Sequence, residues 1–266
     1  MTDYKTIKGQ SVKVLSADPS PVYTGQMWYN TTDNALNVNK LVETWTEGNN
    51  LNTARKTCPG TSNGAQTAAL AVDGAGAPNP GKFSEEYDGT SWAEGGDTNT
   101  SKQNHAGFGT QTAALIFVTG TSEEYDGSSY TEGTDLNTSR NTLAGFGTQT
   151  AGVGCGGYAP TSNLGETEEY NGASWAESGD FNTARATHGA AGTQTAGLAA
   201  GHHSQGTNSE EYNGTGWTAG NTLNEGRYHL AMFGIQTAAI VAGGFDANAS
   251  PDQLDTVETY DGTSWA

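Results

Sequence analysis

Five cations recur at one position of a repeating pattern, where they could bind an anion or form structural ion pairs. Each lies ten residues after an aromatic side chain: Arg55, Lys102, Arg140, Arg185 and Arg227. Arranged in a ring, they could bind an anion at the mouth of a channel. We favour ion pairs with the repeated glutamates that join each repeat to its neighbour, because a guanidinium group matches the geometry of a carboxylate. An acidic chain with few cations is also not expected to leave them unpaired.

Paired carboxylates recur in the motif Glu-Glu-Tyr-Asp/Asn-Gly, for example at Glu85-Glu86. Two neighbouring carboxylates could perform acid–base hydrolysis of a glycosidic bond. Adjacent residues of a strand point to opposite faces of a sheet, however, so the two groups do not converge on one substrate. The motif occurs four times, and Thr259 replaces the second Glu in a fifth copy. This repetition favours a scaffold role, and we predict no catalytic residue and no enzymatic activity.

Histidine and cysteine side chains are weaker candidates for a metal site. Cys58, His105 and His188 lie three residues after the cation, but leucine fills this position in the other two copies. The neighbouring pair His202-His203 is a second small group. Imidazole and thiolate groups can ligate zinc, but a site needs three or four of them around one point. We predict neither a metal site nor a cofactor.

All of these residues belong to a repeat of 38 to 48 residues that is present five times. Each copy predicts four strands: a run of small residues such as His105–Phe108, an apolar run such as Ala113–Val118, a strand ending in Glu-Glu-Tyr, and a strand carrying Trp or Tyr. A Gly-Thr-Gln-Thr turn and an Asp-Gly or Asn-Gly turn separate them. Four antiparallel strands at this period are typical of a β-propeller. We therefore predict an all-β fold with a five-bladed propeller over residues 46–266.

Residues 1–45 lie outside the repeat and predict a small anchoring module. Gly25–Asn30 and Ala35–Val38 read as two strands around a polar turn, in a segment too short for its own core. Trp45 and Trp265 both carry the fourth-strand pattern, although five blades offer only five such places. Either Trp45 begins an extra edge strand or one of the two lies outside the ring.

Charge and hydropathy exclude several classes of function. The net charge of −18 argues against a groove for nucleic-acid phosphates, which needs Lys and Arg. No apolar run approaches the ~18 residues that a membrane span requires, and the first residues lack the apolar core of a secretory signal. Residues 1–82 carry 7 basic and 6 acidic side chains, whereas residues 83–266 carry 4 and 23. The two parts are therefore expected to face different surroundings.

The copies resemble Kelch repeats, which carry Arg before the first strand, a Gly pair after the second, Tyr on the third and Trp on the fourth. Gly156-Gly157 and Gly243-Gly244 match the Gly pair, whereas other copies keep one Gly. The phrases Leu-Asn-Thr-Ala-Arg, Gly-Thr-Gln-Thr-Ala and Glu-Glu-Tyr-Asp-Gly-Thr-Ser-Trp resemble Kelch-like propellers of marine bacteriophages, notably cyanophages, over roughly residues 45–266. The N-terminal hairpin resembles one found in many phage tail-fibre proteins.

Spacing locates the part of the repeat that varies. The distance from Gln of the Gln-Thr-Ala turn to Tyr of the third strand is 21, 14, 21, 18 and 24 residues, while the other spacings are nearly constant. Variable loops on a fixed scaffold are where recognition usually lies, although unconstrained loops also drift freely. The loops are Asn79–Phe83, Gly157–Leu164, His202–Asn208 and Phe245–Gln253. The recognition candidates are Asn79, Lys82, Phe83, Tyr158, His202, His203, Phe245, Asp246 and Asp252.

The resemblance implies a virion structural protein, assembled in the host cytoplasm, such as a tail fibre or surface appendage. We expect the N-terminal module to bind other virion proteins and the propeller to contact a host surface polysaccharide or protein, with homo-oligomer formation left open. Nucleic acid and membrane insertion are not expected. A capsid or tail decoration protein without receptor binding is the alternative, and a glycan-acting enzyme is the third reading.

Overall fold

The chain forms two compact units, Met1–Glu47 and Gly48–Ala266. The computed structural model describes residues 13–17, 27–32, 35–38, 47–58, 61, 64–75, 82–203, 206–246 and 253–266. In the first unit, β1 (Lys13–Leu15) runs parallel to β2 (Met27–Asn30), which pairs in antiparallel register with β3 (Ala35–Val38). The hairpin was predicted and the parallel strand was not. Trp45 lies outside the described residues.

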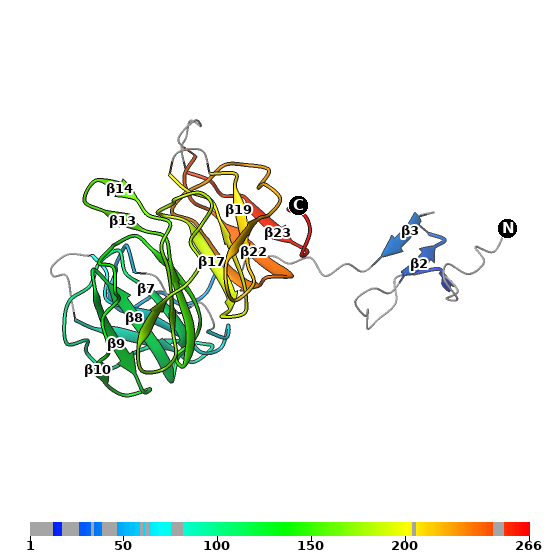
Figure 1. Cartoon of the computed structure of the whole chain (residues 1–266). Coiled ribbons are helices and arrows are strands. Elements are labelled where there is room, and N and C mark those ends of the chain that lie inside the picture. Colours follow the sequence, from blue (N-terminus) through cyan, green and yellow to red (C-terminus); the bar gives the residue numbers. More distant parts are fainter. Residues whose placement is uncertain are drawn as a thin grey trace. The chain divides into compact units, whose positions relative to one another are not determined.

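The second unit is a five-bladed β-propeller arrangement built of antiparallel sheets that follow one another along the chain (Figure 1). Blades 2 to 4 each contain four strands in sequence order. They are β7 (Ala106–Thr110), β8 (Ala113–Val118), β9 (Thr121–Tyr125) and β10 (Tyr130–Glu132); β11 (Ala144–Thr148), β12 (Ala151–Cys155), β15 (Thr167–Tyr170) and β16 (Trp175–Glu177); and β17 (Gly189–Thr193), β18 (Ala196–Ala200), β19 (Ser209–Tyr212) and β20 (Trp217–Ala219).

Blades 1 and 5 are three-stranded within the described residues. Blade 1 contains β4 (Ala69–Val72), β5 (Ser84–Tyr87) and β6 (Trp92–Glu94), and blade 5 contains β21 (Ala231–Ile235), β22 (Ala238–Ala242) and β23 (Val257–Tyr260). Trp265 takes the fourth-strand place of blade 5 through a bridge to Tyr260. No helix among the described residues is long and apolar enough to cross a membrane.

Small residues line the first strands because neighbouring blades meet there. Strands β7, β11, β17 and β21 contact one another in turn. On the first strand β11, a Cβ atom on Gly145 would lie 2.7 Å from the Phe117 ring of the preceding blade. The second strands are equally close, because a Cβ atom on Gly152 would lie 2.1 Å from the Phe108 ring of the preceding blade. Glycine at these positions lets a phenyl ring of one blade pack directly against the backbone of the next.

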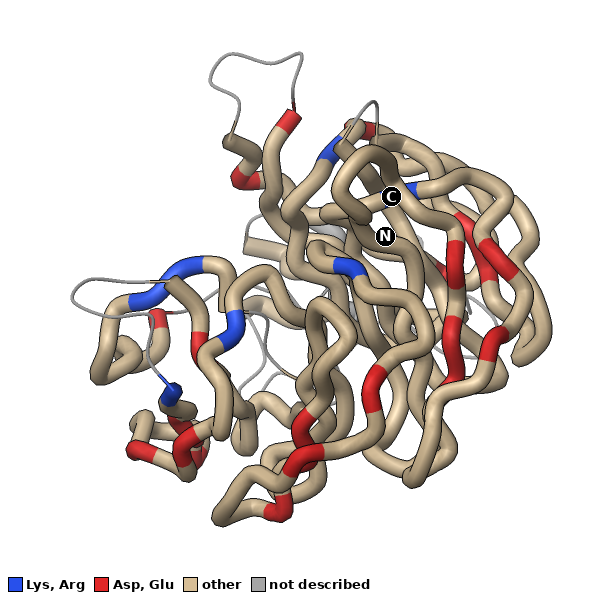
Figure 2. The backbone as a smooth tube through the Cα atoms, turned by 60° about the vertical axis from the view of Figure 1, so that its left-hand side comes forward, with Lys and Arg blue, Asp and Glu red and all other residues tan. Residues whose placement is uncertain are grey.

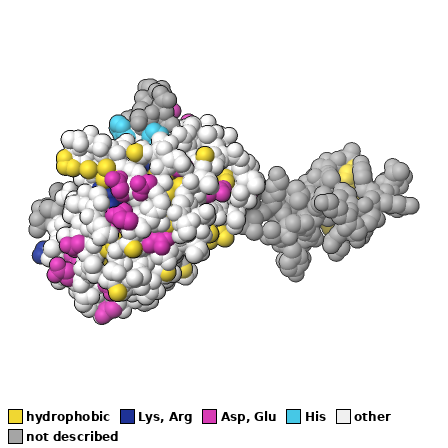
Figure 3. All heavy atoms as spheres, viewed as in Figure 1, with side chains coloured by type: hydrophobic (Ala, Val, Ile, Leu, Met, Phe, Trp, Pro, Cys, Tyr) yellow, Lys and Arg dark blue, Asp and Glu magenta, His cyan; other side chains and the backbone are white. Residues whose placement is uncertain are grey.

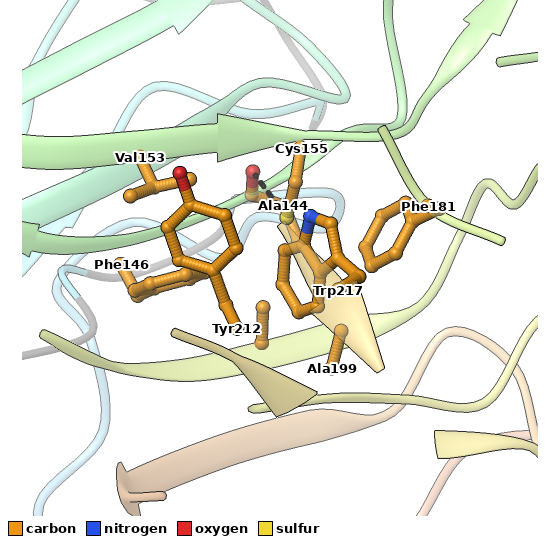
Figure 4. Close-up of a cluster of buried hydrophobic side chains, with 9 residues drawn as sticks. Ala144, Phe146, Val153, Cys155, Phe181, Ala199, Tyr212 and Trp217 are labelled. Atoms are coloured by element: carbon orange, nitrogen blue, oxygen red, sulfur yellow. Dashed lines mark hydrogen bonds between the residues drawn. The ribbon is translucent and has the colours of Figure 1, made fainter. Parts of the chain in front are cut away.

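Between the blades lie the hydrophobic clusters. At the interface of blades 3 and 4, Phe146 and Val153 of one blade pack against Ala199, Tyr212 and Trp217 of the other (Figure 4). The Phe146 and Trp217 rings meet edge to face with centroids 6.2 Å apart. The tyrosine and the tryptophan of the repeat thus fill the gap between sheets, where burial of a large aromatic ring is most stabilising.

Two hydrogen-bonding residues of the repeat link each of blades 2 to 5 to the blade before it. The side-chain amide of Gln149 donates to the carbonyl oxygens of Ala114 and Tyr125, at 3.0 and 2.9 Å. The Tyr212 hydroxyl donates to the carboxylate of Glu169 at 2.5 Å. The same bonds recur from Gln111, Gln194 and Gln236, and from Tyr125, Tyr170 and Tyr260. The second glutamate of the Glu-Glu motif therefore serves the contact between blades.

Candidate functional site

The repeated cations are buried in ion pairs with the first glutamate of the motif. The pairs are Arg55–Glu85, Lys102–Glu123, Arg140–Glu168, Arg185–Glu210 and Arg227–Glu258. Each carboxylate also accepts backbone amides of the segment that enters its blade, as Glu168 does from Asn137 and Thr138 at 2.7 and 3.1 Å. Because a glutamate carboxylate already occupies each cation, the five cations do not form an open ring that could bind an anion.

These ion pairs lie within a blade, which corrects the expectation that they pin one blade to the next. Arg140 precedes the first strand of blade 3, and Glu168 lies on the third strand of the same blade. The backbone carbonyl of Arg140, by contrast, accepts the amide of Thr119 in blade 2 at 2.8 Å. The side chain thus fixes the connecting segment to its own blade, while its backbone reaches the preceding one.

The nine recognition candidates do not form one site. Asn79 and Asp252 lie outside the described residues. The exposed Lys82 donates to the carbonyl oxygen of Asn99 at 2.6 Å, and the Phe83 ring lies 4.9 Å from the Arg55 guanidinium, so both side chains have partners within the protein. Tyr158, which is 41% exposed, lies on β13 (Tyr158–Ala159), which pairs with β14 (Ser162–Asn163). The expected loop Gly157–Leu164 is therefore a small hairpin.

The remaining candidates lie in blades 4 and 5, where aromatic and imidazole rings form a cluster that we call the His–Tyr cluster. It consists of His203, Tyr228, His229 and Phe245. The Tyr228 ring is central, with centroid distances of 5.0 Å to His203, 5.4 Å to His229 and 5.7 Å to Phe245. His202 is buried and Asp246 half-buried beside it. Figure 3 shows histidine side chains gathered at one edge of the visible face.

Three separate segments position the His–Tyr cluster. His203 follows β18, Tyr228-His229 precede β21, and Phe245 follows β22. Tyr228 and Phe245 are joined by two backbone hydrogen bonds of 3.0 and 2.8 Å, which bring the variable loop of blade 5 beside the segment that enters it. The His203 and His229 side chains are exposed, and Tyr228 and Phe245 are half-buried. The rings are therefore held by backbone pairing and accessible from outside.

The His–Tyr cluster combines hydrogen-bonding groups with aromatic faces. Although His229 is accessible from outside, the partial burial of its ring and the nearby His203 imidazole lower the pKa of His229. A neutral imidazole offers one donor and one acceptor, and a tyrosine hydroxyl offers both. Aromatic faces beside such groups suit a ligand that has apolar C–H faces and hydroxyl groups, which is the chemistry of a sugar ring.

The histidine and cysteine positions of the repeat, Cys58, His105 and His188, belong to blades 1, 2 and 4. No group of three or more metal-ligating side chains occurs in the described part of the chain. The sulfur of Cys155 lies 3.7 Å from Nε2 of the buried His188, and burial raises the pKa of this thiol to about 12. Burial also lowers the pKa of His188 well below its usual value. Both groups are neutral members of the interior.

Comparison with known proteins supports the propeller fold. No protein-family model matches the chain, and no curated protein matches it. Among solved structures it is similar to one described as the structure of YjhT, with 10% sequence identity and a TM-score of 0.62 over 77% of this chain and 81% of that chain. The chain has a β-propeller fold. At this identity the likeness extends to the fold alone.

Proposed function

We propose that the protein is a surface component of a bacteriophage particle, whose propeller contacts a host surface polysaccharide through the His–Tyr cluster. The observation that carries the proposal is the meeting of four accessible rings, from three segments, where the length of the repeat varies. The sequence motifs that resemble Kelch repeats and phage propellers support a bacteriophage origin. The N-terminal unit would bind other virion proteins.

The repeated carboxylates are already bound to other side chains of the protein, which favours a binding role over catalysis. The first glutamate of each motif is bound to a buried cation, and in blades 1 to 4 the second accepts a tyrosine hydroxyl. A general acid or base must instead be within reach of a substrate proton. We therefore propose that the protein is not an enzyme.

The test is binding of fluorescently labelled protein to a panel of marine bacteria and to their purified surface polysaccharides. Tyr228→Ala and His229→Ala should each weaken binding by about two- to tenfold, because an aromatic ring contact contributes about 0.5–1.5 kcal/mol. Tyr158→Ala is the matched control, since it removes an exposed ring from another blade. Equal binding by all variants would place the contact elsewhere, and no binding to any strain would favour the decoration role.

A further inference from the structure

The His–Tyr cluster lies next to a cation whose charge is used inside the protein. Arg227 is the only Lys or Arg among residues 186–266, which supply every member of the cluster. Its buried guanidinium donates to the carbonyl oxygens of Gly243 and Thr256, both at 3.0 Å, and to the carboxylate of Glu258 at 2.9 Å. A ligand bound at the cluster therefore does not meet the positive charge of this side chain.

Carboxylates outnumber this cation in the same part of the chain. Residues 186–266 carry 8 acidic side chains against one basic. Asp246 is the nearest in sequence, because it directly follows Phe245 of the cluster, and it is half-buried there. The neighbouring segments 204–205 and 247–252, which lie outside the described residues, contain no Lys or Arg and one of the eight carboxylates. Acidic side chains also outnumber cations on the face seen in Figure 3, so the cluster lies in a negative potential.

The polar groups of the cluster match sugar hydroxyls better than anions. The Tyr228 hydroxyl is uncharged, and it both donates and accepts hydrogen bonds. Partial burial and the nearby His203 imidazole lower the pKa of His229, which favours the neutral ring with one donor and one acceptor. Proteins instead bind carboxylates and sulfates through cationic donors, such as the fork of a guanidinium group. The cluster therefore has partners for hydroxyl groups, and its neighbouring arginine offers none to an anion.

We propose that the His–Tyr cluster selects uncharged sugars and rejects acidic ones, whether carboxylated, sulfated or phosphorylated. The inference rests on the proposed function and names the class of polysaccharide that the same site binds. An acidic sugar would lose water from its anion, gain no cation in return and approach the carboxylate of Asp246. Such a repulsive contact lets a site discriminate between ligands of otherwise similar shape. An uncharged hexose offers the same hydroxyls and C–H faces without this penalty.

The experiment starts from a surface polysaccharide that the unmodified full chain binds in the strain panel. One portion is carboxymethylated, which adds carboxylates, and a second is hydroxyethylated to the same degree, which adds uncharged groups of similar size. The carboxymethylated form should bind about tenfold more weakly than the hydroxyethylated form at low salt. The difference should shrink to under about threefold at about 1 M NaCl, where the Debye length is about 3 Å. A polysaccharide that is acidic as isolated should bind more tightly after its carboxyl groups are reduced to alcohols.

Charge-reversed variants separate the effect of the site from that of the net charge. Asp246→Lys should bring binding of the carboxymethylated form to within about threefold of the hydroxyethylated form. Asp135→Lys makes the same change in net charge at an exposed position of blade 2, and it should keep the difference at about tenfold. Circular dichroism checks that each variant folds. Asp246→Asn, which keeps the shape of the side chain, should also reduce the difference and tests the same carboxylate if the lysine variant does not fold.

The outcomes distinguish failure of this inference from failure of the proposed function. Equal or tighter binding of the carboxymethylated form by the unmodified protein would overturn the inference, and so would equal effects of Asp246→Lys and Asp135→Lys. If Tyr228→Ala still weakens binding in either case, the proposed function stands. Binding to no polysaccharide, or binding that Tyr228→Ala leaves unchanged, would overturn both.

Discussion

At the scale of single residues, the buried ion pairs contribute strongly to the free energy of unfolding. Arg185 is fully buried and paired with Glu210, whose carboxylate also accepts the amide of Asn182 at 2.8 Å. Arg185→Met leaves a buried carboxylate without its cation, which costs about 3–5 kcal/mol of the free energy of unfolding. Urea denaturation measures this loss. Lys82→Met, which removes an exposed cation, should cost under about 0.5 kcal/mol; equal losses in the two variants would contradict the argument.

A second residue, Asp73, makes stability depend on pH. Its buried carboxylate accepts the Thr98 hydroxyl at 2.8 Å and the Lys102 amide at 2.9 Å, but burial raises its pKa to about 6. The folded state therefore binds the proton more tightly than the unfolded state. The stabilisation is complete at low pH and is lost as the pH rises through 6.

Asp73→Asn removes this titration. The difference in free energy of unfolding between the variant and the unmodified protein should shift in favour of the variant from pH 5 to pH 7.5. Urea midpoints at the two pH values measure it, and comparison with the unmodified protein cancels the titration of every other group. A difference that is independent of pH would show that Asp73 keeps an ordinary pKa.

At the scale of the structural element, one turn residue holds neighbouring blades together. Gln149→Ala removes two hydrogen bonds from blade 3 to blade 2 and leaves the Ala114 and Tyr125 carbonyls half-satisfied, so we expect a loss of about 1–3 kcal/mol. Gln66→Ala makes the same change in blade 1, where the side chain is exposed, and should leave the monomer's stability unchanged. Chemical denaturation at low protein concentration compares the two, and equal losses would indicate an unseen partner for Gln66.

The strands were largely predictable because the same sequence pattern occurs five times. The strand Ala113–Val118 was predicted with its observed bounds, and the predicted His105–Phe108 is observed as Ala106–Thr110. The hairpin of β13 and β14 was missed because strands of two residues are too short to show an alternating pattern.

Tyr228, a residue of the candidate site, was missed for a different reason. It lies next to the repeated cation, in a position that holds Lys56, Gln103, Asn141 or Ala186 in the other copies. Only the fold brings it to His203 and Phe245.

At the scale of the whole molecule, excess negative charge opposes folding. Residues 83–266 carry 23 acidic and 4 basic side chains, and Figure 2 shows acidic positions along much of the backbone. The four basic side chains are buried in ion pairs. Salt screens repulsion between surface carboxylates but leaves buried pairs nearly untouched. The melting temperature should therefore rise by about 2–4 °C, or about 1 kcal/mol, between 10 and 300 mM NaCl. Choline chloride should act equally, and a fall in melting temperature would mean that attractive surface pairs dominate.

The repetition of one interface also bears on how such a protein can change over generations. Every blade carries the glutamine and tyrosine needed to join the blade before it and the carbonyls needed to receive the blade after it. A gene duplication that copies one repeat in frame would therefore insert a blade already matched on both sides. Crowding of the first strands at the axis, where glycine and alanine already stand, would be the main obstacle. The number of blades is thus easier to alter than the chemistry of any one of them.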